Sequence, residues 1–194
     1  PTKLQKKIKF DLKKITSSKK NFCNLKFNMI PNILGILNLT PDSFSDGGKF
    51  NNSNKALYQA KKFSEHGCEI LDLGGESTRP GSKIIHEVNE WKRIEGPLKK
   101  IKKLNKFISI DSRKSYVMRN AYKIKLDLVN DISGLDFDDN TINFLKKSKV
   151  PFVIHHIQGT PQNMQKKPKY ANVVLDIYDF FEKKIQQIRA AGIK

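Results

Sequence analysis

The sequence predicts an α/β fold: a partial TIM (β/α)8 barrel of about five strand–helix units, preceded by a basic N-terminal extension. Two observations predict this fold. Short apolar runs alternate with longer segments of helical periodicity from residue 31 onward, and polar side chains follow each apolar run. Alternating strands and helices indicate a parallel sheet, because each helix returns the chain to the start of the next strand.

Residues 1–30 form the predicted extension. They contain nine lysines and a single acidic residue, Asp11. A segment with so much charge of one sign buries little apolar surface, so we expect a tail or interdomain linker that is partly disordered. Residues 31–194 make up the predicted barrel domain.

The barrel domain contains five expected strands and five expected helices. The helical segments have apolar residues at spacings of three and four, as a helix with one buried face requires. The expected strands are 33–39, 69–73, 107–110, 126–129 and 151–154. The expected helices are 54–66, 86–104, 113–124, 138–148 and 173–191.

Polar residues at the strand ends favour a barrel over the alternative, an open doubly wound sheet. In an open sheet the ligand-binding groups gather at one switch point, whereas in a barrel every strand ends at one common mouth. A complete barrel has eight units and typically ~250 residues, so we expect this chain to supply the first five units. The polar strand ends are Asn38, Asp72, Asp111, Asn130 with Asp131, and His156.

Composition narrows the classes of function. The formal net charge is +18, but only five of the 37 basic residues are arginine, and lysines occur along the whole chain. Arginine supplies most bidentate contacts to phosphates and bases, so we interpret the charge as solvated surface and a nucleic-acid partner is disfavoured. Two cysteines without metal-ligand spacing indicate a reducing cytoplasm. No apolar run approaches the ~18 residues of a membrane-spanning helix.

The stretch GILNLTPDSFSDGGKF, residues 35–50, contains the first candidate site residues. Asn38 ends a strand, and its amide oxygen suits a hard cation such as Mg²⁺. The segment after Thr40 and Pro41 is small and polar, with a lone aromatic residue, Phe44. Such a loop can close over a charged ligand and exclude water. The alternative is a surface loop that caps the next helix.

The stretch LDLGGESTRPGS, residues 71–82, contains the second set. Asp72 lies within a strand, and two glycines after it permit close approach of the backbone to a ligand. Thr78 offers a hydroxyl, and Arg79 before Pro80 offers a planar, permanently charged donor that suits phosphate. The alternative is a Gly-Pro turn with a solvated arginine.

Three later strand ends carry further candidates. Asp111 could accept hydrogen bonds from an amino-substituted heterocycle, or it could cap a helix that begins near Arg113. Asn130 and Asp131 alternate sides of their strand, so we expect one of them to face the mouth, and the same holds for the two adjacent histidines, His155 and His156. No dinucleotide, P-loop, zinc or nucleophile-elbow motif is present.

Together these stretches resemble dihydropteroate synthase, a pterin-binding TIM-barrel family. GILNLTPDSFSDGG and LDLGGESTRPGS resemble its two signature segments, and SIDS, VNDISG and HIQGTPQNMQKKPKY follow in the family's order. The resemblance implies condensation of 6-hydroxymethyl-7,8-dihydropterin pyrophosphate with p-aminobenzoate to dihydropteroate and pyrophosphate. Sulfonamides would act as mimics of p-aminobenzoate. The resemblance covers residues 31–194.

The resemblance also implies roles for single residues. Asn38 would hold Mg²⁺ on the leaving pyrophosphate and act in catalysis with Asp72, which would lie beneath the reacting centre. The pterin pyrophosphate would contact Thr78, Asp111 and Asn130. The p-aminobenzoate site and its loops would comprise Thr40, Pro41, Phe44, Arg79 and Pro80.

Two departures from the family pattern stand out. His155 occupies a position where the family has methionine, and the family's further ligands from strands six to eight do not occur in this sequence. We therefore expect the chain alone to be inactive, with fusion to a pterin pyrophosphokinase or pairing with a C-terminal barrel fragment as the expected partnerships. The alternatives are a non-catalytic remnant, a methyltetrahydrofolate methyltransferase-type barrel and a basic nucleic-acid-binding protein.

Overall fold

The computed structural model describes residues 2–17, 31–40, 49–77, 79, 82–160, 163–164 and 167–193. Two compact units make up the chain, Pro1–Asn32 and Ile33–Lys194. This division falls two residues from the boundary expected between the extension and the barrel domain.

The described residues of the first unit contain one helix, α1 (Lys3–Ser17), in the segment that was expected to be a partly disordered tail or linker. A reciprocal pair of hydrogen bonds explains where it begins. The Gln5 N–H donates to Thr2 Oγ1 at 3.2 Å, and the Thr2 N–H donates to Gln5 Oε1 at 2.9 Å. This capping box satisfies two backbone donors, and the lysines and leucines that follow are good helix formers.

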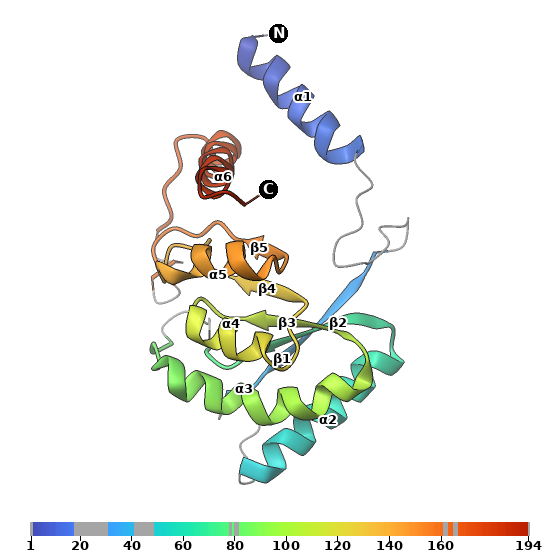
Figure 1. Ribbon diagram of the computed structural model, residues 1–194. Helices are drawn as coiled ribbons and strands as arrows, with labels where there is room; N and C mark the ends of the chain where they lie inside the picture. Colours follow the sequence, from blue (N-terminus) through green and yellow to red (C-terminus); the bar gives the residue numbers. More distant parts are fainter. Residues whose placement is uncertain are drawn as a thin grey trace. The chain divides into compact units, whose positions relative to one another are not determined.

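The second unit is built on a five-stranded parallel sheet in the order β1-β2-β3-β4-β5 (Figure 1). Each strand pairs with its neighbour in sequence, as in a barrel, whereas a doubly wound sheet reverses the order at a switch point. The partial barrel predicted from the sequence is therefore confirmed. The strands are β1 (Ile33–Asn38), β2 (Cys68–Gly74), β3 (Phe107–Asp111), β4 (Leu128–Asp131) and β5 (Phe152–Ile154).

A helix follows each strand, as expected. The fourth strand begins at Leu128 rather than at residue 126, because the Asp127 carboxylate accepts the Ile108 N–H at 2.8 Å in place of a backbone partner. The helices are α2 (Lys49–Glu65), α3 (Glu87–Ile101), with a 3-10 turn η2 (Lys102–Leu104), α4 (Ser115–Tyr122), α5 (Asn140–Ser148) and α6 (Val173–Ala190).

The core lies on the helix-covered face of the sheet. Alternate strand residues such as Leu71, Leu73 and Ile110 are fully buried there against α2, α3 and α4. On the other face, Ile36 is 57% exposed and Asn38 is exposed. The apolar core on one face of the sheet therefore stabilises the unit, and the other face is available to polar residues.

Gly75, directly after β2, packs closely against α3. A Cβ at this position would lie 2.9 Å from the Glu90 carbonyl oxygen and 3.0 Å from Ile94 Cγ1. We expect Gly75→Ala to lower the free energy of unfolding by about 2 kcal/mol, because a helix backbone must move to admit the methyl group. Chemical denaturation measures this loss.

The neighbouring glycine provides the control. A Cβ at Gly74 would meet Asp111 Oδ2 at 3.4 Å, an ordinary contact. Gly74→Ala should therefore cost much less stability than Gly75→Ala. Equal losses for the two variants would contradict the packing argument.

Candidate active site

One row of residues crosses the sheet at the carboxyl ends of the strands. Asn38 pairs with Gly74, Gly74 with Asp111, and Asp111 with Asn130. Residues in register across a parallel sheet point to the same face, so the three polar side chains share the face opposite the helices. Asp72 lies two residues before Gly74 and points the same way. The structure thus brings together four residues that the sequence placed at separate strand ends.

A chain of hydrogen bonds links three of the strands on this face. Asn130 Nδ2 lies 3.0 Å from Asp72 Oδ2, and Asn130 Oδ1 lies 2.6 Å from His155 Nε2. Asn130 is therefore the member of its pair that faces the mouth. Asp131 is fully buried on the other face, where it accepts the Ser133 N–H at 2.8 Å and the Ser133 hydroxyl at 2.6 Å.

The two histidines also separate as strand alternation requires. His156 turns away from Asn130, and its Nε2 lies 3.1 Å from the Tyr170 hydroxyl. Its ring also stacks edge-to-face on Phe180 of α6, with ring centroids 4.6 Å apart. The expectation that the two histidines do not act on one ligand together agrees with this geometry. The bond between His155 and Asn130 was not anticipated, and the adjacency of two strands is the only signal that could have found it.

Two carboxyl groups on this face have raised pKa values. Burial raises the pKa of Asp111 to about 7, and the charges of Asp72, Glu90, Asp131 and Glu76 act in the same direction. Burial also raises the pKa of Asp72, against hydrogen bonds that favour its charged form. Two carboxyl groups of raised pKa on the same face as Asn38 and Asn130 make this face a candidate functional site.

Asp111 does not cap α4, which was the alternative interpretation. The N-cap residue of α4 is Lys114, and the Ser115 N–H is bound at 2.8 Å by Asp138 Oδ2 from the segment before α5. The carboxylate of Asp111 is therefore not used to cap α4 and lies at the carboxyl end of the sheet. Its role as a ligand-binding group remains a prediction.

A buried ion network supports the ends of β2 and β3. Glu76 binds Arg113 at 3.0 Å and Lys114 at 2.9 Å, and Lys114 also binds Glu90 of α3 at 2.6 Å. All four side chains are almost completely buried. Sequence reasoning missed this network, because Arg113 and Lys114 have the appearance of ordinary surface residues in a lysine-rich chain.

The network also closes the base of the second loop. Glu76 Oε1 accepts the Ile85 N–H at 2.8 Å, and the Gly75 carbonyl accepts a hydrogen bond from Arg93 of α3 at 2.8 Å. Between these anchors, Arg79 is exposed. The loop therefore begins and ends at fixed points while Arg79 reaches solvent.

The other predicted site residues belong to the first and second loops. Thr40 follows β1 and is half-buried. Four others lie outside the described residues: Pro41, Phe44, Thr78 and Pro80.

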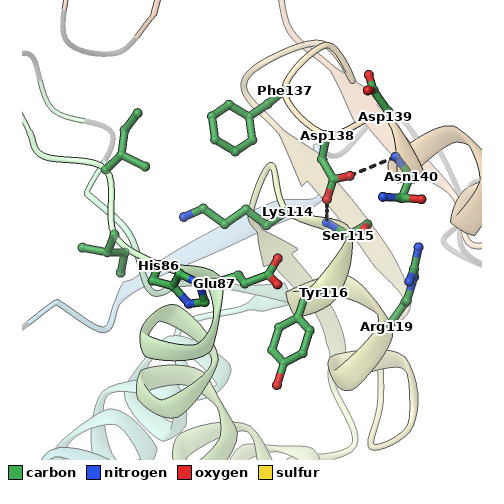
Figure 2. A pocket seen from close by; sticks show the side chains of 12 residues that line it. His86, Glu87, Lys114, Ser115, Tyr116, Arg119, Phe137, Asp138, Asp139 and Asn140 are labelled. Carbon is green, nitrogen blue, oxygen red and sulfur yellow. Dashed lines mark hydrogen bonds between the residues drawn. The ribbon is translucent and has the colours of Figure 1, made fainter.

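A cavity of about 710 Å³ lies elsewhere, near the N-termini of α3, α4 and α5 (Figure 2). Its wall includes His86, Tyr116, Arg119 and Phe137, with Asp138 bound to Ser115 and Asn140. None of the residues in the strand-end row lines it. The row remains the better candidate, because it gathers the perturbed carboxyl groups and the amide on one face.

Metal binding in the described part of the chain would depend on few protein ligands. No group of three or more His, Cys, Asp or Glu side chains there is arranged to hold a metal ion. Asn38 nevertheless presents an exposed amide at the end of β1, in the same row as Asp111. A single oxygen ligand of this kind fits Mg²⁺ that is held mainly by water and phosphate oxygens.

Among the described helices, none has the length and apolar character needed to span a membrane.

Comparison with known proteins identifies the family of the chain. The family described as pterin binding enzyme matches residues 34–194. Dihydropteroate synthase of Haemophilus influenzae is 43% identical over 166 residues, which cover 85% of this chain and 60% of that protein. The folate synthesis bifunctional protein of Arabidopsis thaliana is 35% identical over 167 residues, 83% of this chain and 34% of that protein.

Solved structures show the same relationship. Yersinia pestis dihydropteroate synthase in complex with a sulfonamide drug matches with a TM-score of 0.79 and 36% identity, over 88% of this chain and 62% of that chain. The Xanthomonas albilineans enzyme with 4-aminobenzoic acid matches with a TM-score of 0.81 and 30% identity, over 91% and 63%. This chain spans 60% of the length of the H. influenzae relative. From the family match and the identities to these synthases, we conclude that the chain belongs to the pterin binding enzyme family.

Proposed function

We propose that this chain forms the pterin-binding part of a dihydropteroate synthase, which joins 6-hydroxymethyl-7,8-dihydropterin pyrophosphate to p-aminobenzoate. The observation that carries the proposal is the strand-end row, in which Asn38, Asp111 and Asn130 share one face with Asp72. Relatives named dihydropteroate synthase support it. We place the protein in the cytoplasm, where folate synthesis would supply its substrates.

In this proposal Asp111 and Asn130 bind the edge of the pterin ring. That edge presents amino, ring N–H and carbonyl groups, and a carboxylate beside an amide offers complementary acceptors and a donor. Ionised Asp111 is an acceptor only, so it pairs with the donors of the ring. Asp72 lies beneath, where it holds the Asn130 amide in place through their bond of 3.0 Å.

The chemical step needs positive charge beside the departing pyrophosphate and does not need a protein nucleophile. The bond between the pterin methylene carbon and the pyrophosphate oxygen breaks, the arylamine nitrogen attacks that carbon, and the nitrogen then loses a proton. Mg²⁺ held by Asn38 would neutralise charge on the departing pyrophosphate. Arg79 adds a fixed positive charge from the second loop.

The first and second loops build the p-aminobenzoate site in this proposal. Thr40, Pro41 and Phe44 would come from the first loop, and Thr78 and Pro80 from the second. Closure of both loops would exclude water from the reactive methylene carbon. The residues of strands six to eight would come from a further part of the protein or from a partner chain, and a fused pterin pyrophosphokinase would supply the substrate.

Direct binding tests the proposal without requiring turnover. We expect the chain to bind 6-hydroxymethylpterin, detected by its intrinsic fluorescence, and inorganic pyrophosphate in a Mg²⁺-dependent manner by calorimetry. Asp111→Ala should weaken pterin binding about 100-fold, because a charge-assisted pair of hydrogen bonds is lost.

Three outcomes would contradict the proposal. One is the absence of pterin binding to folded protein. Another is methyl transfer from methyltetrahydrofolate, which would indicate the methyltransferase alternative. The third is tight, steeply salt-dependent binding of DNA or RNA that persists after residues 1–30 are removed, which would indicate a nucleic-acid-binding protein.

A further inference from the structure

His155 contacts the side-chain amide of Asn130 in the strand-end row. The orientation of this amide decides whether a ligand faces its oxygen or its nitrogen. Asn130 uses both ends of its amide, with Nδ2 at 3.0 Å from Asp72 and Oδ1 at 2.6 Å from His155 Nε2. Oxygen and nitrogen of an amide have almost the same shape, so the charges of the two neighbours decide which way it points. An amide turned by 180° would exchange the positions of the donor and the acceptor that it offers to a ligand.

The charge of Asp72 selects one orientation of the Asn130 amide, and that orientation sets what His155 must supply. An ionised Asp72 accepts hydrogen bonds and does not donate them, so it favours Nδ2 of Asn130 over Oδ1. The other end of the amide is then an acceptor, which requires a hydrogen on His155 Nε2. Both the Nε2–H tautomer and the imidazolium supply that hydrogen. In each case His155 donates to Asn130, and Asn130 donates to Asp72.

His155 is held on this face by the residue after it. His156 turns to the other side, where its ring packs on Phe180 and its Nε2 lies 3.1 Å from the Tyr170 hydroxyl. A strand-like segment sends adjacent side chains to opposite sides, so the anchored His156 directs His155 toward Asn130. The position of His155 is thus set by packing outside the site.

We propose that His155 is a positioning residue, which donates from Nε2 to Asn130 Oδ1 and so locks the Asn130 amide with Nδ2 on Asp72. The second hydrogen on Nδ2 and the second lone pair on Oδ1 then remain for the pterin. This inference rests on the proposed function for its ligand, but the tautomer and the amide orientation belong to the chain itself.

Two substitutions separate hydrogen bonding from packing. His155→Phe retains a ring and removes the donor, whereas His155→Gln retains an N–H donor on a shorter side chain. We expect His155→Phe to raise the Kd for 6-hydroxymethylpterin about tenfold, and His155→Gln to stay within about threefold of the parent chain. Melting temperatures check that each variant is folded.

A double-mutant cycle then tests whether His155 acts through Asn130. In an Asn130→Ala background, His155→Phe should change the Kd less than about twofold, because the amide that it orients is gone. An unchanged Kd for His155→Phe in the parent chain would overturn the proposal. An equally large effect in the Asn130→Ala background would also overturn it, since His155 would then act independently.

Nitrogen NMR of the ligand-free chain distinguishes this inference from the proposed function. The imidazole nitrogens of His155 should show a protonated Nε2, coupled through the hydrogen bond to the Asn130 side chain. An Nε2 without a proton would overturn the inference even if pterin binds. A protonated Nε2 in a chain that binds no pterin would support the orientation of Asn130 and reject the proposed function.

Discussion

Replacing Asp111 by asparagine is expected to stabilise the chain at pH 8 and to weaken its binding of pterin. Partial burial and the nearby charges of Asp72 and Glu90 raise the pKa of Asp111 to about 7, so at pH 8 the folded chain holds a half-buried carboxylate in an unfavourable environment. A neutral amide of the same size removes this repulsion. We expect a gain of about 2 kcal/mol in the free energy of unfolding, and a loss of pterin affinity, because an amide supplies one acceptor where the carboxylate supplies two.

The same pKa predicts the direction of a pH dependence. The carboxyl of Asp111 is protonated in the folded chain up to about pH 7, whereas in the unfolded chain it loses its proton near its ordinary pKa of 3.8. Between these values the folded state binds more protons than the unfolded state, so stability falls as the pH rises. The contribution is fully present below the unfolded pKa and is lost through pH 7. Asp111→Asn should therefore flatten the decline between pH 4 and 7, measured by urea denaturation at several pH values.

Asp138 offers a matched control with the opposite sign. Burial alone would raise its pKa, but hydrogen bonds from Asn140 and Ser115 hold the pKa below its ordinary value. Its charged form therefore stabilises the fold above the unfolded pKa, and this contribution is lost as the pH falls through the folded pKa. Asp138→Asn should destabilise the chain at pH 8 by about 1 kcal/mol. A stabilising effect at both positions would show that general loss of negative charge, rather than the site, is responsible.

The second large effect is expected from Lys114→Met, which should destabilise the chain by about 4 kcal/mol. Lys114 lies between the buried carboxylates of Glu76 and Glu90, at 2.9 and 2.6 Å. Methionine fills much of the same volume but leaves Glu90 without its cation. The stability loss follows because an unpaired buried charge costs far more than the ion pair contributes. Thermal and chemical denaturation measure it.

Lys99→Met is the control for Lys114→Met. Lys99 pairs with Glu95 at 2.6 Å across one turn of α3, but both side chains are largely exposed, so the loss should be about 0.5 kcal/mol. Where Lys114→Met alone does not fold, the double variant Lys114→Met, Glu90→Gln should recover part of the stability, since it removes the unpaired charge. A single and a double variant of equal instability would contradict the electrostatic explanation.

The sequence alone predicted the strand–helix alternation and the polar strand ends, because both depend on local patterns of two and of three to four residues. The same patterns placed Asn38, Asp72, Asp111 and Asn130 among the candidate site residues. The sequence did not predict α1, since the dense lysine charge of the segment indicates disorder, whereas the bonds exchanged between Thr2 and Gln5 begin a helix there.

The tertiary structure decided which side chains meet. The register of neighbouring strands aligned Asn38, Asp111 and Asn130 in one row, and the packing of β4 against β5 brought His155 to Asn130. The burial of Lys114 between two carboxylates depended on α3 lying against the ends of β2 and β3. Periodicity in a sequence assigns each residue to a face of its own element, but contacts between elements depend on register and packing, which no local pattern encodes.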